Sequence, residues 1–272
     1  METIILGDYL PQGFYKIHSI FKNVCNFINA NNELIFITNL KNNIAANSIY
    51  IENKNIAQYN SIQIAENALF LNDINILPHA EFYDSKVDYS EIDNQMLENN
   101  LQDIPLKYNE LFAPESMLFV IDSERCSFFK SGFDFHFMKN SLKACEMIKS
   151  GETEEGVKML KGTGRGLTPS GDDFIAGLLY GLHFNEYKYQ KPLGNLRTSL
   201  YRNSIGNNLL SNAFLLNSKN GNCFYLLKKI VYLTSQTKLV SDNLEELFKM
   251  GATSGADLLS GYIFSVINKT GI

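Results

Sequence analysis

The hydrophobic pattern of this 272-residue chain changes its period near the middle, and this change limits the possible folds. Up to about residue 125, short apolar runs alternate with clusters of Asn, Asp, Gly and Pro, which is typical of short β-strands in a sandwich or small barrel. From residue 137 onward, apolar residues recur at helical spacing. The sequence therefore predicts an α+β fold, with a β-rich sandwich or barrel-like domain over 1–135 packed on an α-helical domain over 136–272.

The expected elements follow from these two patterns. Strands are predicted within 13–28 and at 33–38, 48–51, 61–64, 68–71 and 117–121. Helices are predicted at 137–149, 154–161, 170–184, 196–216, 223–233, 243–250 and 254–267. Residues 84–112 are polar and acidic and are expected to form a long connection with one helix.

Composition excludes several classes of function. The net charge of −5 gives no positive field for nucleic acid or an anionic membrane surface. No apolar run reaches the roughly 18 residues of a membrane helix, and no basic segment opens a secretory signal. We therefore expect a cytoplasmic protein that binds neither membranes nor nucleic acid. The four cysteines and four histidines are scattered, so neither a disulfide framework nor a zinc site is expected.

The most informative stretch is a glycine-rich turn that opens onto an apolar helix, with the sequence GTGRGLTPSGDD from Gly162 to Asp173. Alternating glycines permit positive φ and leave backbone N–H groups unobstructed. Pro169 disfavours helix at the residue before it, so Ser170 is expected to cap the helix with Asp173 three residues later. No Lys-Ser/Thr pair follows the glycines and no strand precedes them, which excludes a P-loop and a dinucleotide-binding turn.

Two interpretations of this turn remain open from the sequence. A well-capped helix after a tight turn is the simpler one, but it requires neither three glycines nor two adjacent carboxylates. A small-anion site at the helix N-terminus is the other, with Arg165 neutralising the charge. The binding residues would then be Gly164, Gly166, Thr168, Ser170 and Gly171. Asp172 and Asp173 would bind Mg²⁺ or a substrate amide, although no cofactor is firmly implied.

The start of this helix occurs a second time. Residues 170–177 align without gaps to residues 254–261, with the shared pattern S-G-x-D-apolar-apolar-small-G. We expect the two helices to pack together with their N-termini at one end, which places Asp173 and Asp257 across a shared cleft. Further binding residues of this cleft would be Thr253, Ser254 and Gly255. The alternative is that two unrelated helices use a common cap.

The segment 196–216 is a third candidate for the lining of the cleft, because it is rich in uncharged polar side chains. Ser199, Asn203, Asn207 and Ser211 fall on one face of a continuous helix, and Arg197 offers a second cation for an anionic substrate. A solvated helix face would give the same pattern.

These motifs resemble those of the AllH family, whose members are subunits of oxamate carbamoyltransferase. The long signature L-x-G-x-G-x-G-L-T-P-S-G-D-D corresponds to residues 160–173, and T-S-G-A-D corresponds to residues 253–257. The run from His18 to Asn23 is similar to the opening strands of the family. The resemblance spans most of the chain.

The resemblance implies transfer of a carbamoyl group between carbamoyl phosphate and oxamate, giving oxalurate and phosphate or the reverse, in the nitrogen catabolism of purines and allantoin. It also implies sister subunits as partners and a small anionic substrate. Asp172, Asp173, Asp257 and Arg165 are the candidates for catalysis, and the three carboxylates are the candidates for holding Mg²⁺ if a metal binds. Two alternatives stay open: a non-catalytic accessory subunit of the same complex, and a small-molecule phosphotransferase.

Overall fold

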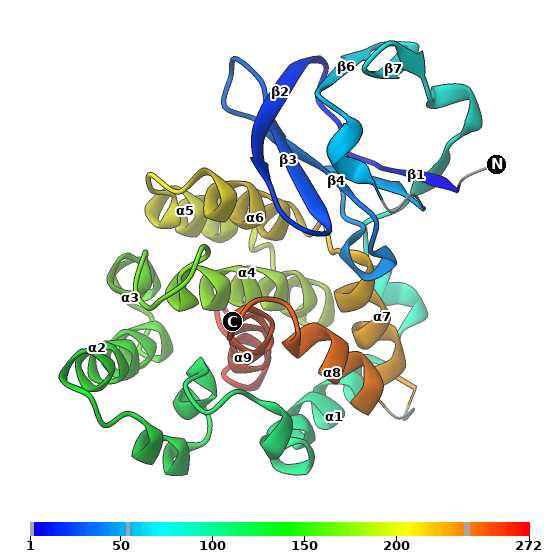
Figure 1. The fold of residues 1–272 in the computed structure, drawn as a ribbon. Helices are drawn as coiled ribbons and strands as arrows, with labels where there is room; N and C mark the ends of the chain where they lie inside the picture. The colour runs from blue at the N-terminus through cyan, green and yellow to red at the C-terminus, as the bar shows by residue number, and fades with distance from the viewer. Residues whose placement is uncertain (1–2, 53–54, 237–239) are drawn as a thin grey trace. The chain divides into compact units, whose positions relative to one another are not determined.

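The computed structural model describes residues 3–52, 55–236 and 240–272, which form two compact units. The first unit contains the chain up to Val87 together with Asn222–Lys228, and the second contains Asp88–Gly221 together with Lys229–Ile272. The first is built on a β-sheet and the second on helices (Figure 1). The predicted α+β class, with a β-rich first part and a helical second part, is confirmed.

The first unit is a curled nine-stranded sheet with the order β8-β7-β6-β2-β3-β4-β5-β1-β9. Its neighbours are antiparallel except for β4–β5 and β1–β9, which are parallel. The strands are β1 (Ile4–Gly7), β2 (Gly13–Ile20), β3 (Val24–Ile28), β4 (Leu34–Thr38), β5 (Ser48–Ile51), β6 (Ser61–Ala65), β7 (Ala68–Leu71), β8 (Ile74–Asn75) and β9 (Glu81–Tyr83).

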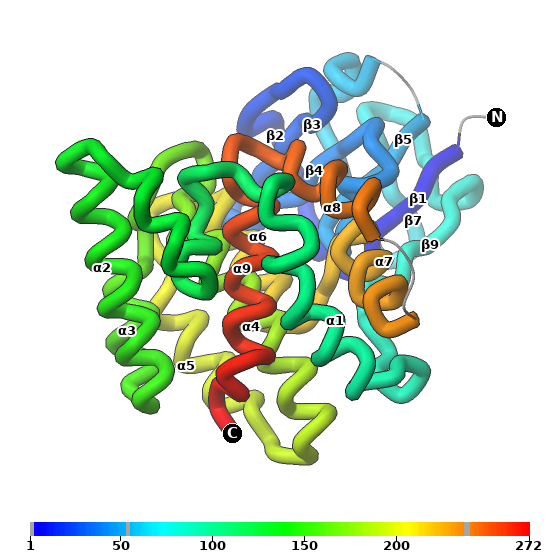
Figure 2. The backbone as a smooth tube through the Cα atoms, turned by 90° about the horizontal axis from the view of Figure 1, so that it is seen from below, coloured from blue at the N-terminus to red at the C-terminus, as the bar shows by residue number. Residues whose placement is uncertain are grey.

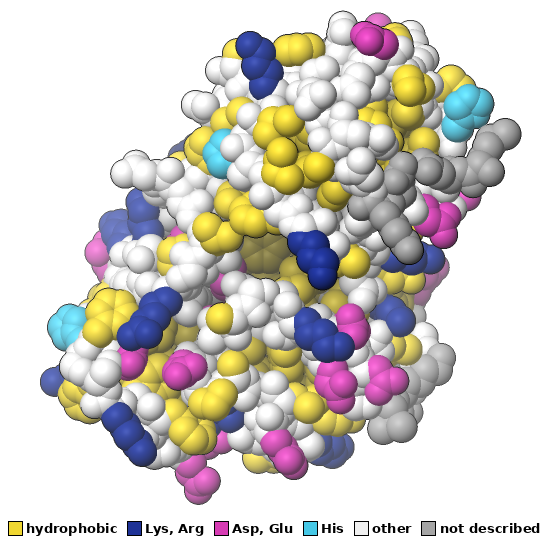
Figure 3. Space-filling view, in the orientation of Figure 1, with side chains coloured by type: hydrophobic (Ala, Val, Ile, Leu, Met, Phe, Trp, Pro, Cys, Tyr) yellow, Lys and Arg dark blue, Asp and Glu magenta, His cyan; other side chains and the backbone are white. Residues whose placement is uncertain are grey.

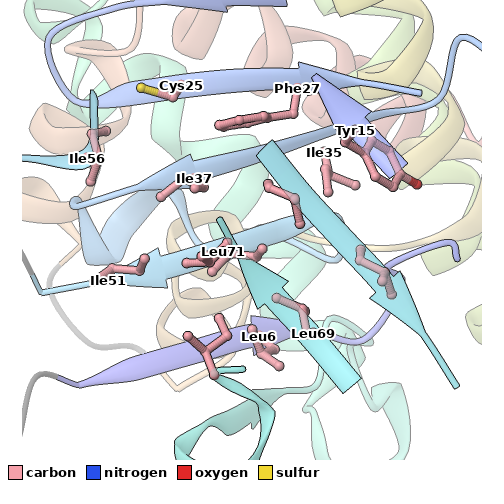
Figure 4. Packing of buried hydrophobic residues seen from close by; sticks show 14 residues of the cluster. Leu6, Tyr15, Cys25, Phe27, Ile35, Ile37, Ile51, Ile56, Leu69 and Leu71 are labelled. Atoms are coloured by element: carbon pink, nitrogen blue, oxygen red, sulfur yellow. The ribbon is translucent and has the colours of Figure 1, made fainter. Parts of the chain in front are cut away.

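Alternation of side chains along the strands builds the core of this sheet. In the antiparallel pair β6–β7, Ile62 lies opposite Leu71 and Ile64 lies opposite Leu69, and all four side chains are buried. Buried hydrophobic side chains from β1 to β5 join them, with Tyr15 and Phe27 as the largest (Figure 4). The later segment 222–228 belongs to this unit through hydrogen bonds such as Cys223 N–H to the Ser85 carbonyl at 2.9 Å.

The helices are α1 (Asn94–Lys107), α2 (Gly132–Lys149), α3 (Thr153–Leu160), α4 (Ser170–Tyr189), α5 (Gly194–Ser204), α6 (Leu209–Asn220), α7 (Tyr225–Thr234), α8 (Ser241–Phe248) and α9 (Ser254–Ile267). At the centre of the second unit, α4 lies against α9 (Figures 1 and 2). Both are apolar around most of their circumference, because α3, α5 and α6 pack on α4 while α1 and α8 pack on α9. The pair is therefore the core of this unit.

Two elements differ from the sequence prediction. The strand predicted at 117–121 is wrong, because Met117–Val120 form a 3₁₀ helix whose first three side chains are buried; a short apolar run does not distinguish these states. The single helix predicted at 196–216 is also wrong, because the chain breaks between α5 and α6 at residues 205–208. Gly206 lies in this break and Asn208 caps the new helix. Residues 88–135, assigned to the β-rich part from sequence, group with the helices.

In the view of Figure 3, hydrophobic side chains show at the surface in several groups, and acidic and basic side chains lie among them mainly on the helical unit. Among the described residues, no helix is both long and apolar enough to cross a bilayer.

Candidate functional site

Two helical hairpins of the second unit are related to each other, and each ends in one copy of the repeated motif. The first hairpin is α3, the glycine-rich turn and α4, and the second is α8, a shorter turn and α9. In the first, a methyl group at Gly171 would lie 2.0 Å from the carbonyl oxygen of Leu160 in α3. In the second, a methyl group at Gly255 would lie 2.0 Å from the carbonyl oxygen of Leu247 in α8. Glycine thus lets both hairpins close in the same way.

The turns of the two hairpins correspond as well. Gly164 and Gly251 both have positive φ, 96° and 65°, and a methyl group on either would meet the serine that opens the helix, Ser170 or Ser254. Between these glycines and serines the first turn is three residues longer, and we refer to Arg165-Gly166-Leu167 as the insertion. The turn glycines Gly162 and Gly166 also have positive φ, which confirms why the turn needs glycine.

The hairpins pack with a local two-fold relation. At the crossing, a methyl group on Gly177 would lie 1.9 Å from the Leu258 carbonyl oxygen. A methyl group on Gly261, the equivalent residue, would lie 2.0 Å from the Phe174 carbonyl oxygen. Phe174 and Leu258 are themselves equivalent in the repeat, so each helix makes the same contact with the other.

Because of this packing, the two helix N-termini meet, as predicted from the repeat. The Thr168 hydroxyl lies 3.1 Å from the Ser254 hydroxyl, and the Ser170 hydroxyl lies 3.3 Å from the Thr253 hydroxyl. The predicted capping box is wrong: Ser170 is the first helical residue, and its side chain makes no cap hydrogen bond. Its hydroxyl faces the other helix instead. The same is true of Ser254, which opens α9 without a side-chain cap.

Asp173 and Asp257 lie together beneath these hydroxyl groups, and we refer to them as the carboxyl pair. Their exposed fractions are 2% and 0%. The Thr168 hydroxyl donates to Asp173 Oδ2 at 3.1 Å, and the Met117 backbone N–H donates to Asp257 Oδ1 at 2.6 Å. No donor among the described residues reaches Asp257 Oδ2 with normal hydrogen-bond geometry. The hydroxyls of Thr253 and Ser170 are nevertheless close enough to lower the pKa of Asp257.

Burial changes the ionisation of the carboxyl pair. Desolvation is the main cause that raises the pKa of Asp257 to about 7, and the Met117 amide is the main influence against it. Desolvation, followed by repulsion from Asp257, raises the pKa of Asp173 well above its ordinary value. The two carboxyls therefore hold protons at a pH where exposed aspartates are ionised, and a carboxyl titrating near neutrality is suited to general acid–base chemistry.

Asp172 has a different role from the carboxyl pair. Its Oδ1 accepts a hydrogen bond from the Gly162 N–H at 2.7 Å, so it holds the start of the glycine-rich turn. The second hairpin has Ala256 at the equivalent position. Within the described part of the chain, no three His, Cys, Asp or Glu side chains are arranged to hold a metal ion. Binding of Mg²⁺ at Asp172, Asp173 or Asp257 stays a prediction, because one or two carboxylates together with water ligands suffice for this ion.

The two candidate arginines do not join the carboxyl pair. Arg165 is exposed and pairs with Asp134 of α2 at 2.9 Å, with its guanidinium 5.2 Å from the ring centre of Phe133. Arg197 pairs with Glu186 at 2.5 Å. Glu186 lies 16 residues along α4 from Ser170, about 24 Å at 1.5 Å per residue. Arg197 thus lies toward the opposite end of the helix.

The other predicted binding residues are engaged elsewhere or lie apart. Gly171 and Gly255 use their backbone N–H groups within their own turns, and the polar residues of 196–216 lie in separate elements. The Gly171 N–H donates to the Thr163 carbonyl at 2.9 Å, and the Gly255 N–H donates to the Met250 carbonyl at 3.3 Å, so both are engaged within their own turns. The polar face predicted along 196–216 does not exist, because Ser199 is in α5, Asn207 is in the break and Ser211 is in α6.

Sequence reasoning missed three groups that hold the site. The Met117 amide acts through the backbone and therefore leaves no side-chain signature. Asp134 binds Arg165 across 31 residues of sequence. The Asn208 side chain donates to the Leu167 carbonyl at 2.5 Å while it caps α6. Only Asn208 was predictable from the sequence, because an Asn before an apolar run indicates the start of a helix.

The fold and site define a class of protein in which two related helical hairpins bury a carboxyl pair where their helix N-termini meet, in a chain that also contains a separate sheet unit. The chain belongs to the AllH family. Residues 160–266 match the family described as oxamate carbamoyltransferase subunit AllH, and residues 4–88 match the AllH family N-terminal domain. No match was found among curated proteins or among solved structures.

Proposed function

We propose that this chain is a subunit of an oxamate carbamoyltransferase and that the meeting point of α4 and α9 binds its small anionic substrate. The observation that carries the proposal is the carboxyl pair, buried at two helix N-termini beneath four hydroxyl groups. The description of the matching family supports the reaction class. The family name also supports sister subunits as partners.

The chemistry of the site suits this reaction. The oxamate nitrogen attacks the carbamoyl carbon, the bond from that carbon to the phosphate oxygen breaks, and the nitrogen loses one proton. A carboxylate with a pKa near neutrality accepts this proton and returns it to the departing phosphate. In the reverse direction the same carboxyl protonates the leaving nitrogen of oxalurate, while phosphate forms the new bond to carbon.

The proposed binding groups lie at the surface above the carboxyl pair. Thr168, Thr253 and Ser254 are partly exposed, and Gly166 is exposed. In this proposal, N–H groups of Gly164, Arg165 and Gly166 bind the phosphate or carboxylate, and the two helix dipoles favour the negative charge. Gly171 is not part of this set, because its N–H is already engaged.

The test is carbamoyl transfer by the chain alone and after assembly with its sister subunits. We expect Asp257→Asn to lower turnover of the assembled enzyme by at least about 100-fold, the low end of a general acid–base contribution. Asp103→Asn, an exposed carboxylate on α1, is the matched control and should retain activity. Full activity of an assembled Asp257→Asn enzyme would instead identify an accessory subunit.

The phosphotransferase alternative is tested separately by thermal unfolding. A ligand at 100 times its dissociation constant stabilises by about 2.7 kcal/mol. We expect carbamoyl phosphate, and not ATP with Mg²⁺, to raise the melting temperature of the assembled enzyme. A shift with ATP alone would support a kinase-like activity.

A further inference from the structure

The local two-fold relation of the hairpins is broken around the carboxyl pair, and the break distinguishes the two carboxyls. Asp257 Oδ1 accepts the Met117 N–H at 2.6 Å, in a buried position. Asp173 Oδ2 accepts from the Thr168 hydroxyl at 3.1 Å, and the Ser254 hydroxyl is also close enough to lower the pKa of Asp173. A backbone N–H only donates, whereas a hydroxyl either donates or accepts.

This difference in donors affects which of the two carboxyls can hold a proton. Asp257 Oδ1 must act as an acceptor, which favours the ionised form of that carboxyl. The hydroxyl beside Asp173 can turn around and accept a hydrogen bond from a protonated carboxyl, so that carboxyl can hold a proton and keep its partner. Repulsion from Asp257 raises the pKa of Asp173, and Asp172 of α4 adds to this repulsion.

We propose that Asp173 keeps a proton while Asp257 is the carboxyl that ionises. The hydrogen bond from the Met117 amide determines which of the two ionises, because it favours the charged form of Asp257. The proposal rests on the proposed function for its chemical meaning: Asp257 is the base and Asp173 the neutral hydrogen-bonding partner. The protonation of the two carboxyls at each pH can be measured without substrate.

A buried arginine holds the Met117 segment in place. Arg125 is 4% exposed, and its guanidinium donates to the carbonyls of Asn109, Phe112 and Ala113 and to the Asn109 side chain, at 2.6–3.2 Å. These bonds tie the 3₁₀ stretch Ser123–Phe128 to the chain that leads into Met117. Arg125 is therefore a positioning residue for the Met117 amide.

The first experiment is isotope-edited infrared titration of aspartate carboxyls in the full chain. We expect the wild type to show buried carboxyls that stay protonated above the ordinary aspartate range. Asp173→Asn should leave the lower of their midpoints in place, because Asn is close in shape to a protonated aspartic acid. Asp257→Asn should abolish that midpoint and leave a higher one.

Each of the other outcomes contradicts the proposal. If Asp257→Asn preserves the lower midpoint and Asp173→Asn removes it, the assignment is reversed. If both variants retain the same midpoint, the two carboxyls are equivalent. If the wild type shows no protonated aspartate above the ordinary range, no proton is retained.

The second experiment removes the amide proton itself. Met117 is the first residue of its 3₁₀ helix and follows Ser116 in an extended conformation with ψ 158°, a position that tolerates proline. Met117→Ala is the matched control, because it also loses the buried side chain but keeps the N–H. Relative to this control, Met117→Pro should raise the Asp257 midpoint by about 1 to 2 pH units, the effect of one hydrogen bond to a charged group. Equal midpoints in the two variants would show that the amide does not set the assignment.

Discussion

At the scale of single residues, glycine decides how closely the two central helices approach. Small residues in both repeat copies indicated a close crossing from the sequence, and the carbonyl contacts at Gly177 and Gly261 confirm it. The hydrogen-bond partners of the serines were not predictable in the same way. A capping pattern is local, whereas the hydroxyl contacts join residues more than 80 positions apart.

Substitution of a crossing glycine is expected to destabilise the fold strongly. In Gly177→Ala the new methyl group meets the Leu258 carbonyl oxygen at 1.9 Å, so the helices must separate. We expect a loss of about 2–4 kcal/mol in the free energy of unfolding, measured by urea denaturation. Gly132→Ala on α2 is the control: nothing lies within 4 Å of its new methyl group, and stability should be unchanged or slightly higher.

Stability is expected to fall as pH rises through the range where the carboxyl pair is protonated only in the folded state. The unfolded pKa of Asp257 is near 3.8 and its folded pKa is about 7, so the folded chain binds more protons between these values. The contribution is full below about pH 4 and is lost by about pH 7, on the order of a few kcal/mol.

Chemical denaturation across this pH range measures the effect. Asp257→Asn removes the titrating group and should reduce the change in unfolding free energy between pH 4 and pH 7. The control is Asp73→Asn at an exposed residue, which should leave this change as it is in the wild type. A slope of opposite sign, with stability rising from pH 4 to 7 and removed by Asp257→Asn, would contradict the raised pKa.

At the scale of elements, the helices that carry the repeat were predicted well, and α9 was predicted with the bounds observed. Each has sustained apolar spacing and a turn with glycine before it. The region 109–128 was not predictable, because its 3₁₀ helices are short and are held by Arg125 through backbone carbonyls distant in sequence. Short apolar runs of this kind carry no period long enough to identify.

Deleting Arg165-Gly166-Leu167 should preserve the fold and remove ligand binding. The second hairpin closes with a turn three residues shorter and makes the equivalent glycine–serine contact. The first hairpin is therefore expected to close with a turn of that length as well. We expect the free energy of unfolding to change by about 1 kcal/mol or less. Binding of carbamoyl phosphate, measured by calorimetry on the assembled enzyme, should be lost. Retained binding would exclude the insertion from the site.

The buried arginine is expected to matter more for stability than the exposed one. Arg125→Ala leaves buried carbonyls without donors and should cost about 2–4 kcal/mol in unfolding free energy. Arg165→Ala removes an exposed ion pair and should cost less than about 1 kcal/mol. Thermal unfolding of both variants distinguishes these effects, and equal losses would show that Arg125 is not a structural anchor.

At the scale of the whole molecule, the sheet unit depends on a segment that lies far along the chain. The Tyr225 N–H donates to the Ile44 carbonyl at 2.7 Å, and the Tyr83 hydroxyl donates to the Cys223 carbonyl at 3.0 Å. This arrangement was not predictable from the sequence, because hydrophobic periods report local structure and not which distant segments pair.

A fragment of residues 1–88 is therefore expected to be incomplete. It contains all the strands but lacks 222–228, so hydrogen bonds to Ile44 and Ser85 are missing. We expect faster amide hydrogen exchange around β5 in the fragment than in the full chain, measured by mass spectrometry. Identical protection in the two would show that the later segment adds nothing to the unit.

The covalent linkage of the two hairpins has a consequence that a pair of separate subunits would not share. In a symmetric homodimer, any substitution appears twice, so both halves must present the same groups to a centre on the axis. Within one chain, each half accepts changes independently. One polypeptide can therefore present different groups from two halves of the same shape, and Asp172 and Ala256 already differ at equivalent positions.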